Sequence, residues 1–128
     1  MTGDKFNELM NIMRRLRNDC SWDSVQTHDS IKANTLEEAY EVVEAIDEKD
    51  YPELKNELGD LLLHIVFHSV IGEDMGNFNI NDVIDSISEK LIRRHPHIFS
   101  DTKVDNNSDI ERNWETIKLQ EGRDSVLE

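Results

Sequence analysis

Cysteine, proline and glycine are scarce in this sequence of 128 residues, which contains one cysteine, two prolines and five glycines. A single cysteine, Cys20, cannot form an internal disulfide, which excludes a disulfide framework and suits a reducing compartment. The scarcity of glycine and proline, together with the near absence of alternating β-branched residues, indicates helices rather than strands. The sequence therefore predicts an all-α protein.

Long apolar runs are also missing. The first ten residues, MTGDKFNELM, have no apolar core of signal-peptide length, and no run is long enough to span a membrane. We therefore expect a soluble, cytoplasmic protein with no membrane partner.

Basic residues are few: the sequence has 14 Lys and Arg but 28 Asp and Glu, which gives a formal net charge of −14. This balance argues against a nucleic-acid partner, which requires a basic face. It suits a protein whose acidic groups bind divalent cations. With 37% hydrophobic residues the chain can bury a core. We expect one domain of residues 1–128, with a core of about residues 6–120 and a flexible C-terminal tail.

Apolar residues recur at helical spacing and predict an antiparallel bundle of about four to five helices. The expected helices cover approximately residues 4–17, 31–48, 50–75, 81–95 and 108–120. Pro52 suits the first turn of the third helix, Pro96 stops the fourth, and Ser108 and Glu111 have capping-box spacing at the start of the last. Because the third helix is apolar nearly all round, we expect the chain to self-associate.

Two pairs of carboxylates occupy unusual positions on the second and third expected helices. Glu38 lies at the boundary of the polar and apolar faces, three residues before Glu41, so both side chains can reach one ion. Glu57 and Asp60 share a narrow polar stripe on a helix whose remaining surface is mostly apolar. Such carboxylates must be paired, bound to a metal or exposed in a wet pocket, because burying a charge alone is costly.

Antiparallel packing of these two helices would bring all four carboxylates to one point. Ligation by carboxylate oxygens selects hard cations such as Mg²⁺ or Mn²⁺ over zinc. The alternatives are an ordinary solvated face or pairing with basic residues of other helices. A di-iron site is disfavoured because no Glu or Asp precedes a His by three residues. His64 and His68 are therefore expected to lie in the core or behind the ligands.

Basic and aromatic residues later in the chain suit a phosphorylated substrate. Lys90 and Arg94 lie one turn apart on the fourth expected helix, and Trp114 and Lys118 lie one turn apart on the last. The cations can reach a polyphosphate, and the indole adds an aromatic surface for a nucleotide. The alternative is that these side chains only border or fill the core. Neither GxxxxGK nor GxGxxG occurs, so phosphates would be held by metal and side chains.

Five segments together resemble the MazG family of nucleoside triphosphate pyrophosphohydrolases: CSWDSVQTH, LEEAYEVVEAI, ELGDLLLHIVFH, KLIRRHPHIF and NWETIK. They follow the family order from about Leu9 to Lys118. The resemblance implies an all-α fold, a homodimer or tetramer, and hydrolysis of NTPs or dNTPs to a monophosphate and pyrophosphate. The Mg²⁺ ligands that it implies are Glu38, Glu41, Glu57 and Asp60. Glu37 would be an accessory carboxylate.

The resemblance also implies which residues bind the substrate. Those that would hold the nucleotide are Lys90, Arg94, Trp114 and Lys118. Trp22 and Asp23 would help to close the site, although Ser21 stands where the family usually has proline. Bound Mg²⁺ would neutralise the triphosphate and lower the pKa of a water, with Glu37 or one of the ligands taking its proton. The alternatives are a catalytically inactive metal- or nucleotide-binding module, half of a tandem protein, and a purely structural helical oligomer.

Overall fold

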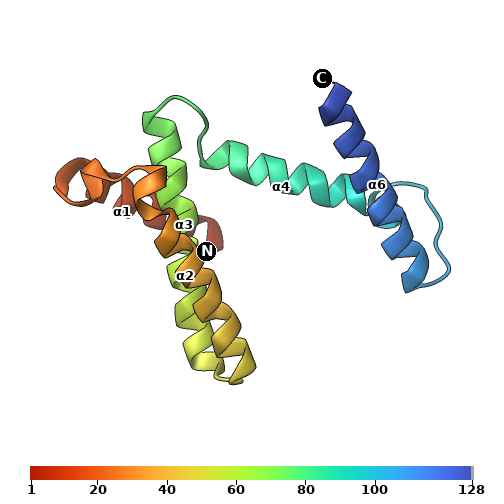
Figure 1. Cartoon of the computed structure of the whole chain (residues 1–128), viewed down its shortest axis with the longest axis horizontal. Helices are drawn as coiled ribbons and strands as arrows, with labels where there is room; N and C mark the ends of the chain where they lie inside the picture. The colour runs from red at the N-terminus through yellow and green to blue at the C-terminus, as the bar shows by residue number, and fades with distance from the viewer. Residues whose placement is uncertain (128) are drawn as a thin grey trace. The chain divides into compact units, whose positions relative to one another are not determined.

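The computed structural model describes residues 1–127, and the side chains of residues 1–122. All of the regular structure in this range is helical, which confirms the predicted all-α class (Figure 1). No helix in the described range is both long and apolar enough to cross a membrane. The chain divides into two compact units, Met1–Ile80 and Asn81–Glu128, and each is described by itself. The expectation of a single domain stays a prediction, and most of the tail expected to be flexible lies outside the described side chains.

The first unit consists of α1 (Thr2–Asp19), η1 (Asp23–Val25), α2 (His28–Asp47) and α3 (Tyr51–Asp74). Helices α2 and α3 lie side by side as an antiparallel hairpin (Figure 1). Both begin with side-chain caps: Thr27 and Ser30 form a capping box, and the Asp50 carboxylate accepts from the Glu53 amide. In the turn between the helices, Lys49 adopts a φ of 56°. These local signals fix where each helix of the hairpin begins and ends.

The core of the first unit is formed by side chains from α1, α2 and α3. The buried apolar residues of these helices are Met10, Met13, Ile31, Ala45, Val66, Phe67, Val70 and Ile71. Arg17 of α1 forms an ion pair of 3.0 Å with Asp74 of α3. The same guanidinium donates to the carbonyl oxygens of Asp23 and Gln26, at 2.7 Å each. One side chain therefore holds the loop before α2 against α1 and α3.

Gly72 in α3 has no room for a side chain, because a Cβ there would lie 2.7 Å from the Phe78 ring. We expect Gly72→Ala to lower the free energy of unfolding by about 1–3 kcal/mol, since the ring must shift. Gly59→Ala in the same helix is the matched control. Nothing lies within 4 Å of its Cβ, and alanine is the better helix former, so stability should rise by about 0.5–1 kcal/mol. Urea unfolding measures both, and a Gly72→Ala protein as stable as the wild type would contradict the expectation.

Three histidines and a threonine form a chain of polar contacts across the α2–α3 seam. The Thr35 hydroxyl lies 2.9 Å from Nδ1 of His64 and 2.9 Å from Nε2 of His68. Nδ1 of His68 lies 2.9 Å from Nδ1 of His28, and the two rings stack. The partners of His64 and His68 in this seam are thus Thr35 and His28.

Burial, followed by the proximity of His28 and His64, lowers the pKa of His68 below its ordinary value of 6.5. The folded state therefore binds fewer protons at this site than the unfolded chain. The resulting stability is present above about pH 6.5 and is lost as the pH falls through the folded pKa. As the pH falls from about 7 to 5, we expect the free energy of unfolding of the wild type, measured in urea, to decrease relative to that of His68→Gln. Equal slopes in the two proteins would refute this.

The second unit is built from α4 (Ile80–Arg94), α5 (Pro96–Phe99) and α6 (Asn107–Leu127). The expected cap of the last helix is wrong, because the side-chain oxygen of Asn106, not Ser108, accepts from the Asp109 amide at 3.0 Å. The helix also continues to the last described residue, so the expected end near Gln120 is wrong as well. The short helix α5 was not predicted.

Candidate functional site

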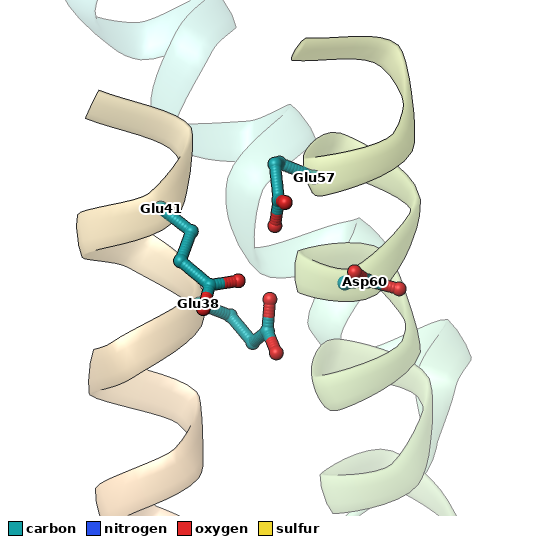
Figure 2. Close-up of side chains that lie close together, drawn as sticks. All are labelled: Glu38, Glu41, Glu57 and Asp60. Atoms are coloured by element: carbon teal, nitrogen blue, oxygen red, sulfur yellow. The ribbon is translucent and has the colours of Figure 1, made fainter. Parts of the chain in front are cut away.

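Four carboxylates lie together between α2 and α3. Glu38 and Glu41, nearly one turn apart on α2, face Glu57 and Asp60 on α3 (Figure 2). One oxygen from each of the four lies within 4.8 Å of the others. Ligand oxygens on opposite sides of a Mg²⁺ ion are about 4.2 Å apart. Small side-chain movements would therefore let one divalent cation contact all four.

When the four carboxylates are ionised, two inner oxygens of this cluster lack partners. Oε2 of Glu38 and Oε2 of Glu57 are buried and accept no hydrogen bond from the described residues. The ion pairs formed among the described residues involve none of the four carboxylates. The alternative of pairing with basic residues is thus not realised in this part of the chain. A buried carboxylate oxygen without a partner is costly, and a bound cation would satisfy it.

The carboxyl groups of the cluster also raise one another's pKa. Hydrogen bonding with Glu41, followed by burial, raises the pKa of Glu57 to about 8. Burial, followed by hydrogen bonding with Glu41, raises the pKa of Glu38. Two carboxylates can share such a hydrogen bond only while one of them keeps its proton. A divalent cation reverses this preference by stabilising the ionised forms, so the residues present suit a bound Mg²⁺.

The other predicted residues of the first unit lie outside the cluster. Glu37 is exposed and acts on the cluster through its charge, which helps to raise the pKa of Glu38. Trp22 is 58% exposed and packs edge-on against Phe67, with 6.4 Å between ring centroids. Asp23 is half-buried, and its carbonyl oxygen accepts a hydrogen bond from α1. That Trp22 and Asp23 help to close the site stays a prediction.

Three of the four residues expected to hold a nucleotide come together in the second unit. The guanidinium carbon of Arg94 lies 5.7 Å from the centroid of the Trp114 ring, and Nζ of Lys118 lies 4.9 Å from it. Both distances are those of cation–π contacts. Lys90 is exposed on α4, one turn before Arg94. Two cations beside an indole can bind the phosphates and base of a nucleotide.

Sequence reasoning missed Glu121. Its carboxylate accepts hydrogen bonds from Arg94 and Arg93, and these arginines, Arg94 first, lower its pKa to about 2. Glu121 follows Trp114 by two turns and Lys118 by one, so it shares their face of α6. That spacing was visible in the sequence. It was overlooked because the last helix was expected to end one residue earlier.

Comparison with known proteins shows which family this chain is similar to. Residues 26–99, which include all four clustered carboxylates, match the model of the MazG nucleotide pyrophosphohydrolase domain. The chain is 50% identical over 121 residues to the nucleoside triphosphate pyrophosphohydrolase/pyrophosphatase MazG of Thermotoga maritima, over 93% of this chain and 46% of that protein. It is 45% identical over 121 residues to the nucleoside triphosphate pyrophosphohydrolase of Escherichia coli K12, over 92% of this chain and 46% of that protein.

The chain spans less than half of the length of these curated relatives. The same is true of the uncharacterized protein YabN of Bacillus subtilis, which is 51% identical over 119 residues, 91% of this chain and 24% of that protein. The crystal structure of a mazG-related protein from Thermotoga maritima is similar in fold, with a TM-score of 0.74 and 23% identity. That similarity covers 88% of this chain and 98% of the other.

Proposed function

Because this chain belongs to the MazG family of nucleotide pyrophosphohydrolases, we propose that it hydrolyses nucleoside triphosphates, ribo or deoxyribo, to the monophosphate and pyrophosphate. The observation that carries the proposal is the cluster of four carboxylates, which includes two buried oxygens without partners. Carboxylates arranged in this way suit Mg²⁺, with Mn²⁺ as a substitute. Hard cations held by carboxylates serve phosphoryl chemistry.

Within this proposal, Glu38, Glu41, Glu57 and Asp60 hold the ion. Bound Mg²⁺ supplies charge neutralisation for the triphosphate and lowers the pKa of the attacking water. The α2–α3 hairpin fixes the carboxylates before substrate arrives, which reduces the ordering needed for reaction. Glu37, which is exposed beside Glu38, or one of the four carboxylates accepts the proton as water attacks.

The second unit supplies the groups for the nucleotide. Arg94, Lys118 and Lys90 stabilise the charge that develops on the phosphates. Trp114, which already contacts Arg94 and Lys118, offers the aromatic surface. These roles follow from the chemistry of the residues and from the family. They do not need a glycine-rich phosphate loop.

We also propose that the protein is a cytoplasmic homodimer or tetramer with no nucleic-acid partner. The large apolar side chains exposed on α2 and α3 include Leu36, Val43, Ile46, Leu58, Leu62, Leu63 and Ile65. Exposed apolar surface of this kind is typical of an interface, and a second copy of the chain would cover it. The net charge of −14 favours small-molecule over nucleic-acid substrates.

The test is the release of monophosphate and pyrophosphate from a panel of NTPs and dNTPs, with Mg²⁺ and with EDTA. We expect both products in Mg²⁺ and neither in EDTA, and the panel ranks the bases. Diphosphate and inorganic phosphate as the products would overturn the proposed bond cleavage. A folded sample that releases nothing from any substrate would contradict the enzymatic function and indicate a binding module.

A further inference from the structure

Glu121 connects α6 to two consecutive arginines of α4. Its Oε2 accepts from Nη2 of Arg94 at 2.8 Å and from Nε of Arg94 at 3.3 Å. Its Oε1 accepts from Nε of Arg93 at 2.5 Å. The side chains of Arg94 and Glu121 are only 21% and 23% exposed, so their pairing is largely shielded from water. A shielded, charge-assisted contact constrains both partners more than an exposed ion pair does.

This contact uses only one edge of the Arg94 guanidinium. A guanidinium carries five N–H donors in one plane. Glu121 occupies the edge formed by Nε and Nη2, and Nη1 donates to no acceptor in the part of the chain that the structure describes. Arginine binds phosphate through two parallel N–H donors, and the edge that includes Nη1 remains available for this. One anion can thus orient Arg94 while it binds another.

The Trp114 ring restrains the same guanidinium from a second direction, since their separation is 5.7 Å. The side chain of Arg94 is therefore ordered by a carboxylate and an indole before any ligand arrives. A flexible arginine must lose its rotational freedom on binding, whereas a restrained one has already lost it. The arrangement favours affinity for a phosphate group at that edge.

The cluster remains attractive to anions although it contains a carboxylate. Hydrogen bonds from Arg94 and then Arg93 hold the pKa of Glu121 at about 2, so Glu121 is ionised at neutral pH. The cations of Arg93, Arg94 and Lys118 outnumber this single negative charge. The net charge of these four side chains is therefore positive, which suits a phosphate group.

We propose that Glu121 is a positioning residue, which holds Arg94 so that the remaining edge of its guanidinium binds a phosphate group of a polyphosphate ligand. The proposal rests on the proposed function in one respect, namely that this polyphosphate is the triphosphate of the substrate. The opposite arrangement would have Glu121 compete with the ligand for Arg94, and its removal would then strengthen binding.

Magnesium tripolyphosphate is the probe, since it contains the phosphates without a base. Isothermal titration calorimetry compares the wild-type chain with Glu121→Gln, Glu121→Asp and the control Glu115→Gln. We expect the Kd to rise about tenfold in Glu121→Gln, as for the loss of a charge-assisted contact. Glu121→Asp keeps the charge but shortens the reach, so its Kd should rise too. Glu115 is exposed on the same helix, and its change should alter the Kd less than about twofold.

Arg94→Gln separates positioning from a general effect on folding. In that background, Glu121→Gln should change the Kd by less than about twofold, because the group that it positions is gone. A purely structural contact between α4 and α6 would instead lower the melting temperature in both backgrounds and leave the Kd of the folded protein unchanged.

Unchanged or tighter binding by folded Glu121→Gln, or no binding by the wild type, overturns the positioning role. The substrate panel distinguishes this from failure of the proposed function. Weaker tripolyphosphate binding by Glu121→Gln, with no hydrolysis of any NTP by the wild type, supports positioning and overturns the function. If the wild type hydrolyses NTPs and Glu121→Gln has the same KM, the proposed function is supported and the positioning role of Glu121 is overturned.

Discussion

Glu57→Gln is expected to abolish Mg²⁺-dependent pyrophosphate release and, at the same time, to stabilise the metal-free protein. Loss of one charged ligand should reduce the rate at least about a thousandfold, because metal-ion stabilisation of the transition state is worth several kcal/mol. The stability should rise because Glu57 contacts Glu41 in a cluster where its pKa reaches about 8. Glutamine needs no proton to lie there, so it removes the cost of protonating Glu57 above about pH 4.5. Initial rates and urea unfolding in EDTA measure the two effects.

The matched control is Asp47→Asn, which changes an exposed carboxylate at the end of α2 that is not one of the four. It should retain the wild-type rate within about twofold, because an exposed carboxylate outside the cluster contributes little. Glu38→Ala and Asp60→Ala should lose activity as Glu57→Gln does, with helix content by circular dichroism unchanged. Full Mg²⁺-dependent activity in any of these three variants would refute its role as a ligand.

The affinity for Mg²⁺ is expected to fall about tenfold for each pH unit below about 8, because the ion binds the ionised form of Glu57 and must displace its proton. The folded pKa of Glu57 lies above its unfolded value of 4.5. Its contribution to the stability of the metal-free protein is therefore present below about pH 4.5 and lost as the pH rises through about 8. Stabilisation by Mg²⁺ should accordingly be largest in mildly alkaline solution.

Calorimetric Mg²⁺ titrations in two buffers of different ionisation enthalpy measure this directly. The number of protons released per ion should approach one well below the pKa of Glu57 and fall toward zero above it. Glu57→Gln serves as the control for heats unrelated to the site. An affinity that stays constant between about pH 6 and 8 would contradict the proton displacement.

The hairpin and its carboxylates could be predicted from the sequence because the signals are local. Helical spacing alone set Glu38 apart from the exposed stripe of α2, and the structure finds it half-buried among the other three. Asp50 and Pro52 marked the start of α3 correctly. Capping and periodicity are properties of a few neighbouring residues, so they need no knowledge of the fold.

Features that depend on distant contacts were not predictable in this way. Arg17 looks like any arginine near a helix end, yet it bonds two carbonyl oxygens of the following loop and Asp74 far along the chain. The contacts of Thr35 with His64 and His68 depend on how α2 and α3 align with each other, which local sequence signals do not give. The role of Glu121 could be predicted only by knowing that α6 continues past residue 120. Helix ends are the least certain part of a prediction from sequence.

The hairpin described above also bears on the order of folding. All four clustered carboxylates lie between residues 38 and 60, and only residues 48–50 separate α2 from α3. Closing so short a loop costs little chain entropy, and contacts of low sequence separation form early. The cluster of four carboxylates can therefore assemble before α1 docks, provided that Lys49 adopts its left-handed φ of 56°. An ion captured at that stage would act as a template for the nascent hairpin as well as a component of the finished protein.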